Sequence, residues 1–460
     1  MRVLLIYPRS CNSIVDSINM AEPLSLEYIA SSLLKGGHEV QILDTRLEQD
    51  SLAAVDAFAP DIIGFTAYTL HVGEVRRVAK ELKERNPNYY ILVGGHLATV
   101  FPADFDHPAI DLIVRGDGTC VINEIVKRVE TRQAMDNIPG AVIPGRPLNG
   151  QPIPHHPHLD TLPLPARHLT EPYRKHYFIE GLHPVALLRT SLGCPSRCNF
   201  CSIWKSVNGK YLLRDIGQIV EELKTIAEPC IYLADDESML HKKRMEQLAD
   251  MIQAEGIQKK FTCYLRVDTI VKHPDLIEKW RNIGLAAGLV GFEAFTDEQL
   301  KGMNKKITVE QQKEATRILK DLDIFNNAQF MVDPSYTRDD FRQLREYVHT
   351  LGLNHAAFTV LTPLPGTQLF EEKANEINTT NPALFDFIHT VLPTTLPLQD
   401  FYDELARLYL KAVPIRNRLP FILKRYGLFK GLQVFKNYLK EQKQFVESVR
   451  NCYRDHEAEA

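Results

Sequence analysis

Short apolar runs alternate with helix-length segments over roughly the first 130 residues of the chain. The predicted strands are 3–7, 40–43, 62–65, 90–93 and 112–114, and apolar residues have helical spacing over 24–34. Buried strands that alternate with helices indicate βαβ units and a parallel sheet. We therefore predict an N-terminal α/β domain over residues 1–138, in which ligands would bind at the carboxyl ends of the strands. No GxGxxG motif follows the first strand, which argues against a dinucleotide site.

A second series of strands and helices begins near residue 183. Its predicted strands are 186–190, 230–234, 261–267, 286–291, 327–332 and 356–361, and the segments between them are long enough for helices. Six strands are two fewer than a closed (β/α)8 barrel has. We predict a partial (β/α)6 barrel over residues 181–370, followed by a helical C-terminal region over residues 371–460.

A proline-rich segment separates the two series. Eight prolines between Pro139 and Pro165 exclude a continuous helix or a central strand, so we predict a surface linker over residues 139–180. His155, His156 and His158 lie within it. A histidine cluster can bind a metal, although an exposed linker fits the proline density better.

Composition narrows the class of protein. Apolar residues make up 44% and charged residues 24% of the 460 positions, which excludes disordered and fibrous classes. The net charge of -4 gives no case for a nucleic-acid partner. Eight cysteines are too sparse for a disulfide scaffold, and no apolar run is long enough to span a bilayer. We therefore expect a reduced, cytoplasmic protein.

The sharpest motif is a group of three cysteines directly after the first barrel strand. Cys194, Cys198 and Cys201 have the spacing C-x3-C-x2-C. Thiolates suit zinc or iron–sulfur centres, but a structural zinc site needs a fourth ligand, and none stands at a regular spacing. Three cysteines can hold three irons of a [4Fe-4S] cluster and leave the fourth iron open to a substrate or cofactor. Three unconnected core cysteines would fit this spacing poorly.

This cysteine loop, the aromatic-rich stretch after it and the six-strand pattern resemble the radical S-adenosylmethionine (SAM) superfamily. The resemblance implies a [4Fe-4S] cluster that binds S-adenosyl-L-methionine and cleaves it to methionine and a 5′-deoxyadenosyl radical. It also implies an external electron donor of the flavodoxin or ferredoxin type.

The same resemblance implies SAM-binding residues at three strand ends. Asp235, Asp236 and Glu237 follow the second barrel strand. Arg266 ends the third strand and Glu293 the fourth, where related enzymes place a basic and an acidic residue around SAM. The alternative for each of these residues is a salt bridge at the barrel rim.

A flavodoxin-like domain before such a barrel resembles the cobalamin-binding subclass of the superfamily. The resemblance implies that cobalamin, as methylcobalamin, contacts residues at the ends of the N-terminal strands, namely Thr66, Tyr68, Thr69, Gly94, Gly95, His96, Gly116, Asp117 and Gly118. The motif D-x-H-x-x-G is absent, so no histidine is assigned as an axial cobalt ligand. A purely structural domain is the alternative.

The stretch from residue 188 to about 414 resembles hopanoid C-3 methylases, for example in Cys201-Ser202-Ile203-Trp204-Lys205 and in His389-Thr390-Val391-Leu392-Pro393-Thr394. The resemblance implies methylation of an unactivated carbon, C-3 of the hopanoid A ring. Two alternatives stay open: a non-methylating enzyme such as an anaerobic porphyrin ring cyclase, and a non-enzymatic cobalamin and iron–sulfur binding protein.

The C-terminal region differs from the rest of the chain in charge. Residues 411–443 contain nine basic residues and one acidic residue, interleaved with apolar side chains. Such a tail suits peripheral contact with the inner face of a membrane, from which a hopanoid substrate would be collected. A helix pair packed on the barrel, with its basic face in solvent, explains the pattern equally well.

Overall fold

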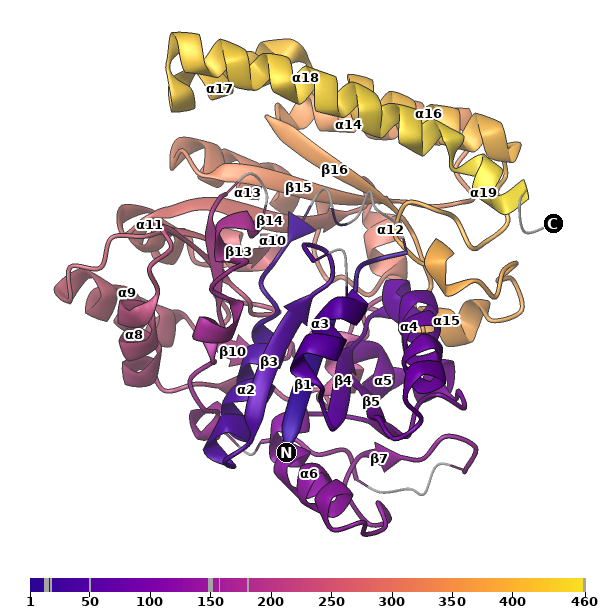
Figure 1. Cartoon of the computed structure of the whole chain (residues 1–460). Helices are drawn as coiled ribbons and strands as arrows, with labels where there is room; N and C mark the ends of the chain where they lie inside the picture. Colours follow the sequence, from indigo (N-terminus) through magenta and orange to yellow (C-terminus); the bar gives the residue numbers. More distant parts are fainter. Residues whose placement is uncertain are drawn as a thin grey trace.

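The N-terminal domain is built on a six-stranded sheet (Figure 1). The computed structural model describes residues 1–11, 16, 19–48, 51–147, 152–156, 158–179 and 182–457. Along the sheet the strands follow the order β3 (Glu39–Asp44), β1 (Arg2–Tyr7), β4 (Ile62–Thr66), β5 (Tyr90–Gly94), β6 (Leu112–Val114) and β7 (Ala141–Val142). The first five strands are parallel in flavodoxin order, which confirms the predicted fold. Antiparallel β7 was not predicted, because it has two residues and lies in the proline-rich segment.

Helices cover both faces of this sheet. Helices α3 (Ser51–Phe58) and α4 (Val72–Arg85) pack on one face, and α2 (Leu24–Lys35) and α6 (Ile122–Glu130) on the other. Short α5 (His96–Val100) follows β5. Alternate residues of β1 enter the two opposite cores, which is why this strand is a continuous apolar run.

The second domain is an open barrel of six parallel strands. Their order is β9 (Val185–Leu188), β12 (Cys230–Leu233), β13 (Lys260–Arg266), β14 (Leu285–Glu293), β15 (Phe325–Val332) and β16 (His355–Val360). Within the described residues the edge strands β9 and β16 do not pair with each other, so the barrel does not close. The predicted partial (β/α)6 barrel is confirmed, with each predicted strand within three residues of the observed bounds.

Helices pack around the outside of the barrel strands in one large core. They are α8 (Ile216–Thr225), α9 (Lys242–Ala254), α10 (Val267–Lys272), α11 (Pro274–Asn282), α12 (Asp297–Gly302), α13 (Val309–Asp321) and α14 (Arg338–Leu351). Two short helices lie outside this core: α7 (Ile203–Ser206) contacts α5, and α15 (Gln368–Lys373) packs through Phe370 on a separate small cluster. Two short antiparallel ribbons, β2 (Asn19–Met20) with β8 (Phe178–Ile179) and β10 (Ser191–Leu192) with β11 (Leu212–Leu213), complete the described sheets.

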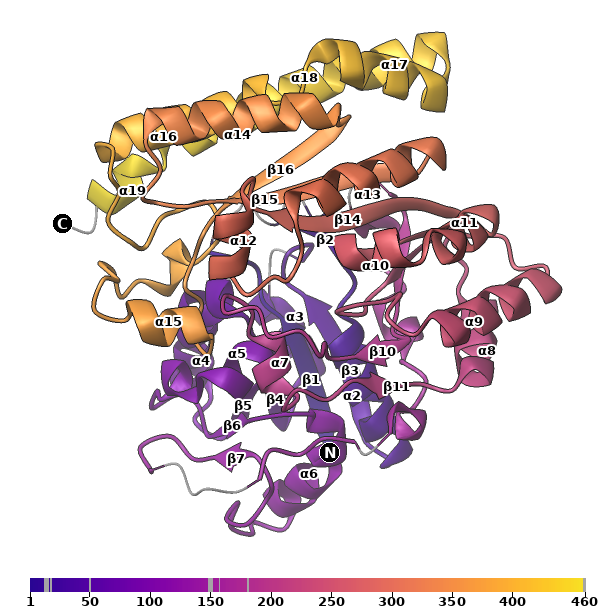
Figure 2. The same ribbon diagram turned by 180° about the vertical axis from the view of Figure 1, so that it is seen from behind.

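The C-terminal region is helical, as predicted. Its elements are α16 (Leu398–Lys411), α17 (Ile415–Tyr426), α18 (Leu428–Asn451) and α19 (Tyr453–Glu457). Helix α16 packs on β16 and α14, and the α17–α18 hairpin forms an outer layer on the side away from the N-terminal sheet (Figure 2). None of the helices in the described chain is both long and apolar enough to cross a bilayer.

Charged side chains are buried together where the N-terminal domain meets the barrel. Arg167 places one guanidinium nitrogen 2.5 Å from Glu22 Oε1 and another 2.5 Å from Glu222 Oε1. Arg174 lies 2.7 Å from Glu22 Oε2 and also pairs with Glu228. We call these five residues the Arg167 network.

The network corrects one expectation about the proline-rich segment. Arg167 and Arg174 belong to the predicted linker 139–180, yet their side chains are largely buried between the two domains. The segment is therefore not a simple surface crossing, because its charged groups join the domains. Residues 148–151, 157, 180 and 181 of the predicted linker and barrel, and 458–460 of the C-terminal region, lie outside the described residues.

Replacing Arg167 with alanine should lower the free energy of unfolding by about 3–5 kcal/mol, because it removes one of the buried positive charges that balance Glu22, Glu27 and Glu222. Urea denaturation measures the loss. Arg167→Lys should cost less but stay destabilising, because one ammonium cannot span Glu22 and Glu222 as the guanidinium does. Arg317, whose pairs with Glu314 and Asp321 are exposed, provides the matched control, and Arg317→Ala should unfold like the wild type. Equal stability of the two alanine variants would contradict the assignment.

Candidate cofactor site

The three cysteines lie on the loop between β10 and α7, at the carboxyl end of the barrel. Cys198 is buried, and Cys194 and Cys201 are half-buried. Burial raises the pKa of the Cys194 thiol, and burial together with repulsion from the other two cysteines raises the pKa of Cys201 to about 12. Burial thus disfavours the thiolate forms of Cys194 and Cys201, and nearby positive charge would favour them.

The donor set of the loop suits a cluster better than one ion. A structural zinc normally has four protein ligands, whereas this loop supplies three thiols. Thiolates are the usual protein ligands of iron–sulfur clusters. The loop thus fits an iron–sulfur cluster with three cysteine ligands.

Two predicted SAM residues hold the cysteine loop in place. Asp235 accepts hydrogen bonds from the backbone N–H groups of Thr190 (2.7 Å) and Ser191 (2.8 Å). Asp236 accepts one from the N–H of Gly193 at 2.7 Å, next to the first cysteine. Burial raises the pKa of both carboxyls, while these hydrogen bonds favour their ionised forms. Both side chains are therefore used within the protein, and a direct SAM contact by either one stays a prediction.

Glu237 differs from its two neighbours. Its Oε1 accepts a hydrogen bond from the hydroxyl of Thr269 at 3.2 Å, whereas its buried Oε2 has no hydrogen-bond partner among the described residues. Burial raises the pKa of Glu237 to about 7. A buried carboxylate oxygen without a partner suits a cationic group of a ligand, such as the ammonium of SAM.

Arg266 and Glu293 lie at the barrel rim in ion pairs. The Arg266 guanidinium is 2.9 Å from Asp268 Oδ1, and Glu293 Oε1 is 2.5 Å from the ammonium of Lys305. Glu293 has a φ of 65°, and the β14–β15 register shifts immediately before it, which re-aims its side chain. Lys305 Nζ lies 6.0 Å from the centre of the Phe200 ring in the cysteine loop, and Arg266 donates a hydrogen bond to the Lys305 carbonyl at 3.1 Å, so two cations lie near the loop. Sequence reasoning missed Lys305, because it follows a short helix in a loop without a motif.

The N-terminal domain contacts the cysteine loop through His96. Its Nε2 lies 2.7 Å from the hydroxyl of Ser202, the residue after Cys201. The ring of Tyr68 stacks on His96 at 6.1 Å, and 52% of Tyr68 is exposed. Burial lowers the pKa of His96, which favours the neutral ring. The sheet edge predicted to bind cobalamin therefore contacts the loop predicted to bind the cluster. Ser202 was not among the predicted site residues.

Four other predicted cobalamin residues lie at the ends of β4 and β5. Thr66 is buried, and a Cβ on Gly95, which has a φ of 99°, would lie 2.7 Å from the Thr66 hydroxyl. Gly94 ends β5, and Thr69 begins a 3-10 turn over Thr69–His71. Glycine at position 95 is thus required by packing between the strands, and the cobalamin contacts of these residues stay predictions.

Gly116 and Gly118 follow β6 and pack against the chain itself. A Cβ on Gly116 would lie 2.6 Å from the carbonyl oxygen of Pro154, and one on Gly118 would lie 2.8 Å from Ile29. The proline-rich segment therefore occupies space beside Gly116, where the sequence predicts a contact with cobalamin. That contact stays a prediction.

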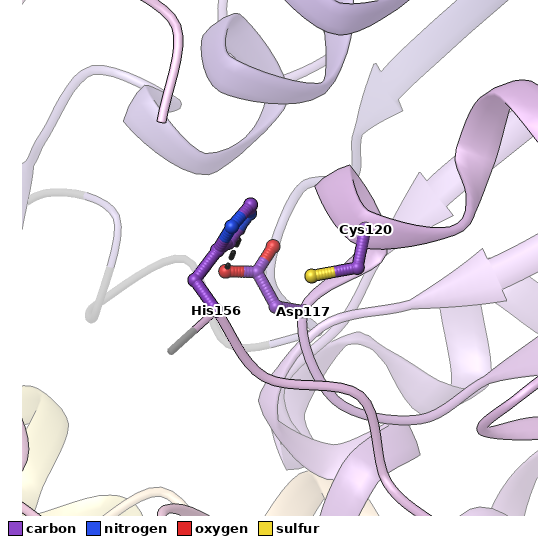
Figure 3. A group of neighbouring side chains, drawn as sticks. All are labelled: Asp117, Cys120 and His156. Atoms are coloured by element: carbon purple, nitrogen blue, oxygen red, sulfur yellow. Dashed lines mark ion pairs between the residues drawn. The ribbon is translucent and has the colours of Figure 1, made fainter. Parts of the chain in front are cut away.

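Asp117 lies in a cluster with Cys120 and His156 (Figure 3). The Nε2 of His156 is 2.6 Å from the hydroxyl of Thr119, which donates to Asp117, and its Nδ1 is 2.7 Å from the hydroxyl of Thr161. His156 is therefore packed on the N-terminal domain rather than exposed in a linker. Because hydroxyls take both ring nitrogens, the cluster is a hydrogen-bond network more than a metal site.

Two families match the sequence in the order of its domains. The B12 binding domain matches residues 17–126, and the Radical SAM superfamily matches residues 188–348. Hopanoid C-3 methylase of Methylococcus capsulatus is 32% identical over 393 residues, which cover 84% of this chain and 75% of that protein. Anaerobic magnesium-protoporphyrin IX monomethyl ester cyclase of Rubrivivax gelatinosus is 26% identical over 428 residues, 89% of this chain and 77% of that one.

A solved structure has the same fold. The cobalamin-dependent S-adenosylmethionine radical enzyme OxsB, with aqua-cobalamin bound, superposes with a TM-score of 0.69 at 15% identity. The superposition covers 100% of this chain and 81% of that one, so the domain arrangement is shared as well as each domain.

Alanine at Cys194, Cys198 or Cys201 should abolish the cluster, because an iron left without its thiolate is lost. Anaerobic reconstitution, with iron and sulfide analysis and the thiolate-to-iron absorption, measures this. Cys263→Ala is the control, because Cys263 is buried like Cys198 but lies on β13 outside the loop. Full iron content in a loop variant, or zinc in place of iron in the wild type, would contradict the assignment.

Three observations point to the same family: the cysteine loop, the order of the two domains and the relative that is 32% identical. The chain belongs to the cobalamin-dependent radical SAM methyltransferase family, with a [4Fe-4S] cluster, S-adenosyl-L-methionine and cobalamin as its cofactors.

Proposed function

We propose that this enzyme methylates an unactivated carbon, C-3 of the A ring of a hopanoid. The relative from Methylococcus capsulatus, a hopanoid C-3 methylase, supports the choice of substrate. The contact between His96 and Ser202 is the observation that supports this mechanism, because a methyl donor and a radical source must reach the same substrate carbon. A contact between the two cofactor edges brings both within reach of one substrate.

The chain's own residues prepare this reaction. When bound, the cofactors supply a 5′-deoxyadenosyl radical and a methyl group. Asp235 and Asp236 hold the cysteine loop rigid, and the Arg167 network keeps the two domains facing each other. Half-exposed Tyr68 presents an aromatic face beside His96, suited to a flat or apolar ligand.

We assign the SAM contacts by the charge that each residue can offer. The unpartnered Oε2 of Glu237 would accept from the SAM ammonium. Arg266, close to the cysteine loop, would face the SAM carboxylate, and Glu293 would reach the ribose from its pair with Lys305. Cobalamin would lie along the N-terminal strand ends beside Tyr68 and His96.

Purified enzyme with a hopanoid, SAM carrying a deuterated methyl group, cobalamin and a flavodoxin- or ferredoxin-type reductant should yield a hopanoid with the labelled methyl at C-3. Mass spectrometry and NMR locate the label. S-Adenosylhomocysteine and 5′-deoxyadenosine should accumulate together, because one SAM supplies the methyl group and a second supplies the radical. Cys198→Ala should give no product above background, and Cys263→Ala should retain activity.

Two outcomes would redirect the proposal. Full-rate methylation by cobalamin-free enzyme would refute the cobalamin route. Conversion of a porphyrin without incorporation of the label would favour a cyclase, the activity named for the 26% identical relative. Membership of an enzyme family removes the non-enzymatic alternative.

We also propose that the α17–α18 hairpin contacts an anionic membrane surface. At its turn Leu428 is 59% and Phe429 88% exposed. Exposed lysines on the two helices are Lys424, Lys430, Lys436, Lys440 and Lys443. Each basic residue near an anionic surface adds about 1 kcal/mol, and apolar side chains at the turn add burial. The hairpin also packs on the barrel, for example through Phe421 on Phe325 at 5.1 Å, so the two sequence interpretations are compatible.

The double variant Leu428→Ser/Phe429→Ser should bind anionic phosphatidylglycerol liposomes at least about tenfold more weakly than the wild type at low salt. Co-sedimentation measures the affinity. Met251→Ser, which alters an exposed apolar residue on α9, is the control and should bind like the wild type. Equal sedimentation of all three proteins would reject the membrane role without affecting the methylation chemistry.

A further inference from the structure

A second group of metal-binding side chains lies far from the cysteine loop in sequence. Within the described chain, His389, Cys452 and Asp455 offer one ligand atom each, and these atoms all lie within 4.8 Å of one another. His389 belongs to the segment between Leu384 and α16, whereas Cys452 and Asp455 lie at the end of α18 and in α19. The group therefore joins the last turns of the chain to the segment that leads into α16.

The ring of His389 is oriented as in many metal sites. Its Nδ1 lies 2.8 Å from Oδ2 of buried Asp386, and Oδ1 of Asp386 accepts from the N–H groups of Ile388 (2.8 Å) and His389 (2.7 Å). With Nδ1 held as a donor, Nε2 is the nitrogen left to face Cys452 and Asp455. A carboxylate behind a histidine in this way fixes the tautomer of metal-binding histidines.

The donor set and its spacing suit zinc. Zinc in proteins binds thiolate, imidazole and carboxylate, with bonds of about 2.0–2.3 Å. The Nε2 of His389 and Oδ2 of Asp455 are 3.0 Å apart, a separation that one ion bound to both atoms would produce. Cys452 is buried, and its thiol donates a long hydrogen bond, 3.4 Å, to the carbonyl of Ser448.

Space for a fourth ligand lies beside these residues. A cavity of about 840 Å³ is lined in part by His456, Leu392 and Thr394. The ring centres of His456 and His389 are 5.6 Å apart, which places this second histidine next to the group. A water molecule from the cavity could therefore complete a four-coordinate site.

The other candidate group, around Asp117, Cys120 and His156, is less suitable. Both ring nitrogens of His156 are engaged by threonine hydroxyls, whereas His389 has only one nitrogen engaged outside the group. Because Cys120 lies in a group of the same three residue types but is less suited to a metal, it serves as the control for Cys452.

We propose that His389, Cys452 and Asp455 bind a zinc ion that fastens the C-terminal end of the chain to the segment leading into α16. Binding replaces the thiol proton of Cys452 and the Nε2 proton of His389, both of which pass to solvent, and no electron is transferred. The proposal does not depend on the proposed substrate.

The metal-free alternative is an ion triad. Burial lowers the pKa of His389, but hydrogen bonds to Asp386 and Cys452 outweigh burial and raise it to about 11. A protonated ring between the carboxylates of Asp386 and Asp455 would then hold the same geometry without an ion. Metal analysis separates the two states.

Holoenzyme with its iron–sulfur cluster in place, so that the loop cysteines are occupied, should contain about one zinc ion per chain after growth with zinc. Elemental analysis after dialysis measures it. Cys452→Ser and Asp455→Asn should lose the zinc and keep the iron, whereas Cys120→Ser should keep both. Asp386→Asn should weaken zinc binding about 10- to 100-fold, because the histidine loses its orienting carboxylate.

Cobalt titration of the wild-type holoenzyme tests the site without any substitution. Treatment with a chelator followed by Co²⁺ should produce a thiolate-to-cobalt charge-transfer band, which zinc then removes. Chelation should also lower the melting temperature of the wild type but not that of Cys452→Ser. Absence of the cobalt band, or equal zinc in the wild type and Cys452→Ser, would overturn the proposal in favour of the ion triad.

Discussion

The guanidinium of Arg167 is the interaction on which the arrangement of this enzyme depends. The N-terminal sheet and the barrel have separate large cores and share no strand, and the contacts between them include two smaller apolar clusters and the Arg167 network. In one of these clusters Leu24 and Tyr28 of α2 pack against Leu187 of β9. Arg167 reaches Glu22 beside the first domain and Glu222 on the barrel at the same time. Because buried charges are costly unless they are paired, only orientations that keep both contacts are stable. The facing edges, and the contact between His96 and Ser202, follow from that constraint.

The requirement that a buried charge has a partner also explains the different roles of three adjacent acidic residues at the barrel rim. Asp235 and Asp236 satisfy their buried charge with N–H groups of the β9–β10 turn and the start of the cysteine loop. Glu237 has one oxygen without a hydrogen-bond partner in the part of the chain that the structure describes. Two carboxylates thus stabilise the loop, and the third is left for a ligand, although all three are consecutive in the chain.

The C-terminal helices combine packing and exposure along one element. Val446 and Val449 on α18 belong to the core around the barrel, whereas Leu428 and Phe429 at the other end of the helix are in solvent. Apolar residues of α18 therefore serve two purposes: those in its C-terminal half pack in the core, and those in its first turn are exposed to solvent. Removal of the whole tail would damage the core, so single side chains at the turn are the informative changes.

Local patterns determined much of this protein. Strand positions follow from short apolar runs, and the C-x3-C-x2-C spacing marks a cluster loop, because periodicity and loop spacing depend only on neighbouring residues. Tertiary structure alone decided the roles of Arg167, Ser202 and Lys305. Glu22 and Arg167 are 145 residues apart, and His96 and Ser202 are 106 apart, so no local signal marks either pair. The prolines correctly predicted that the segment contains no long helix. Whether Arg167 and Arg174 in the same segment are buried depends on the glutamates that the fold brings to them from distant parts of the chain.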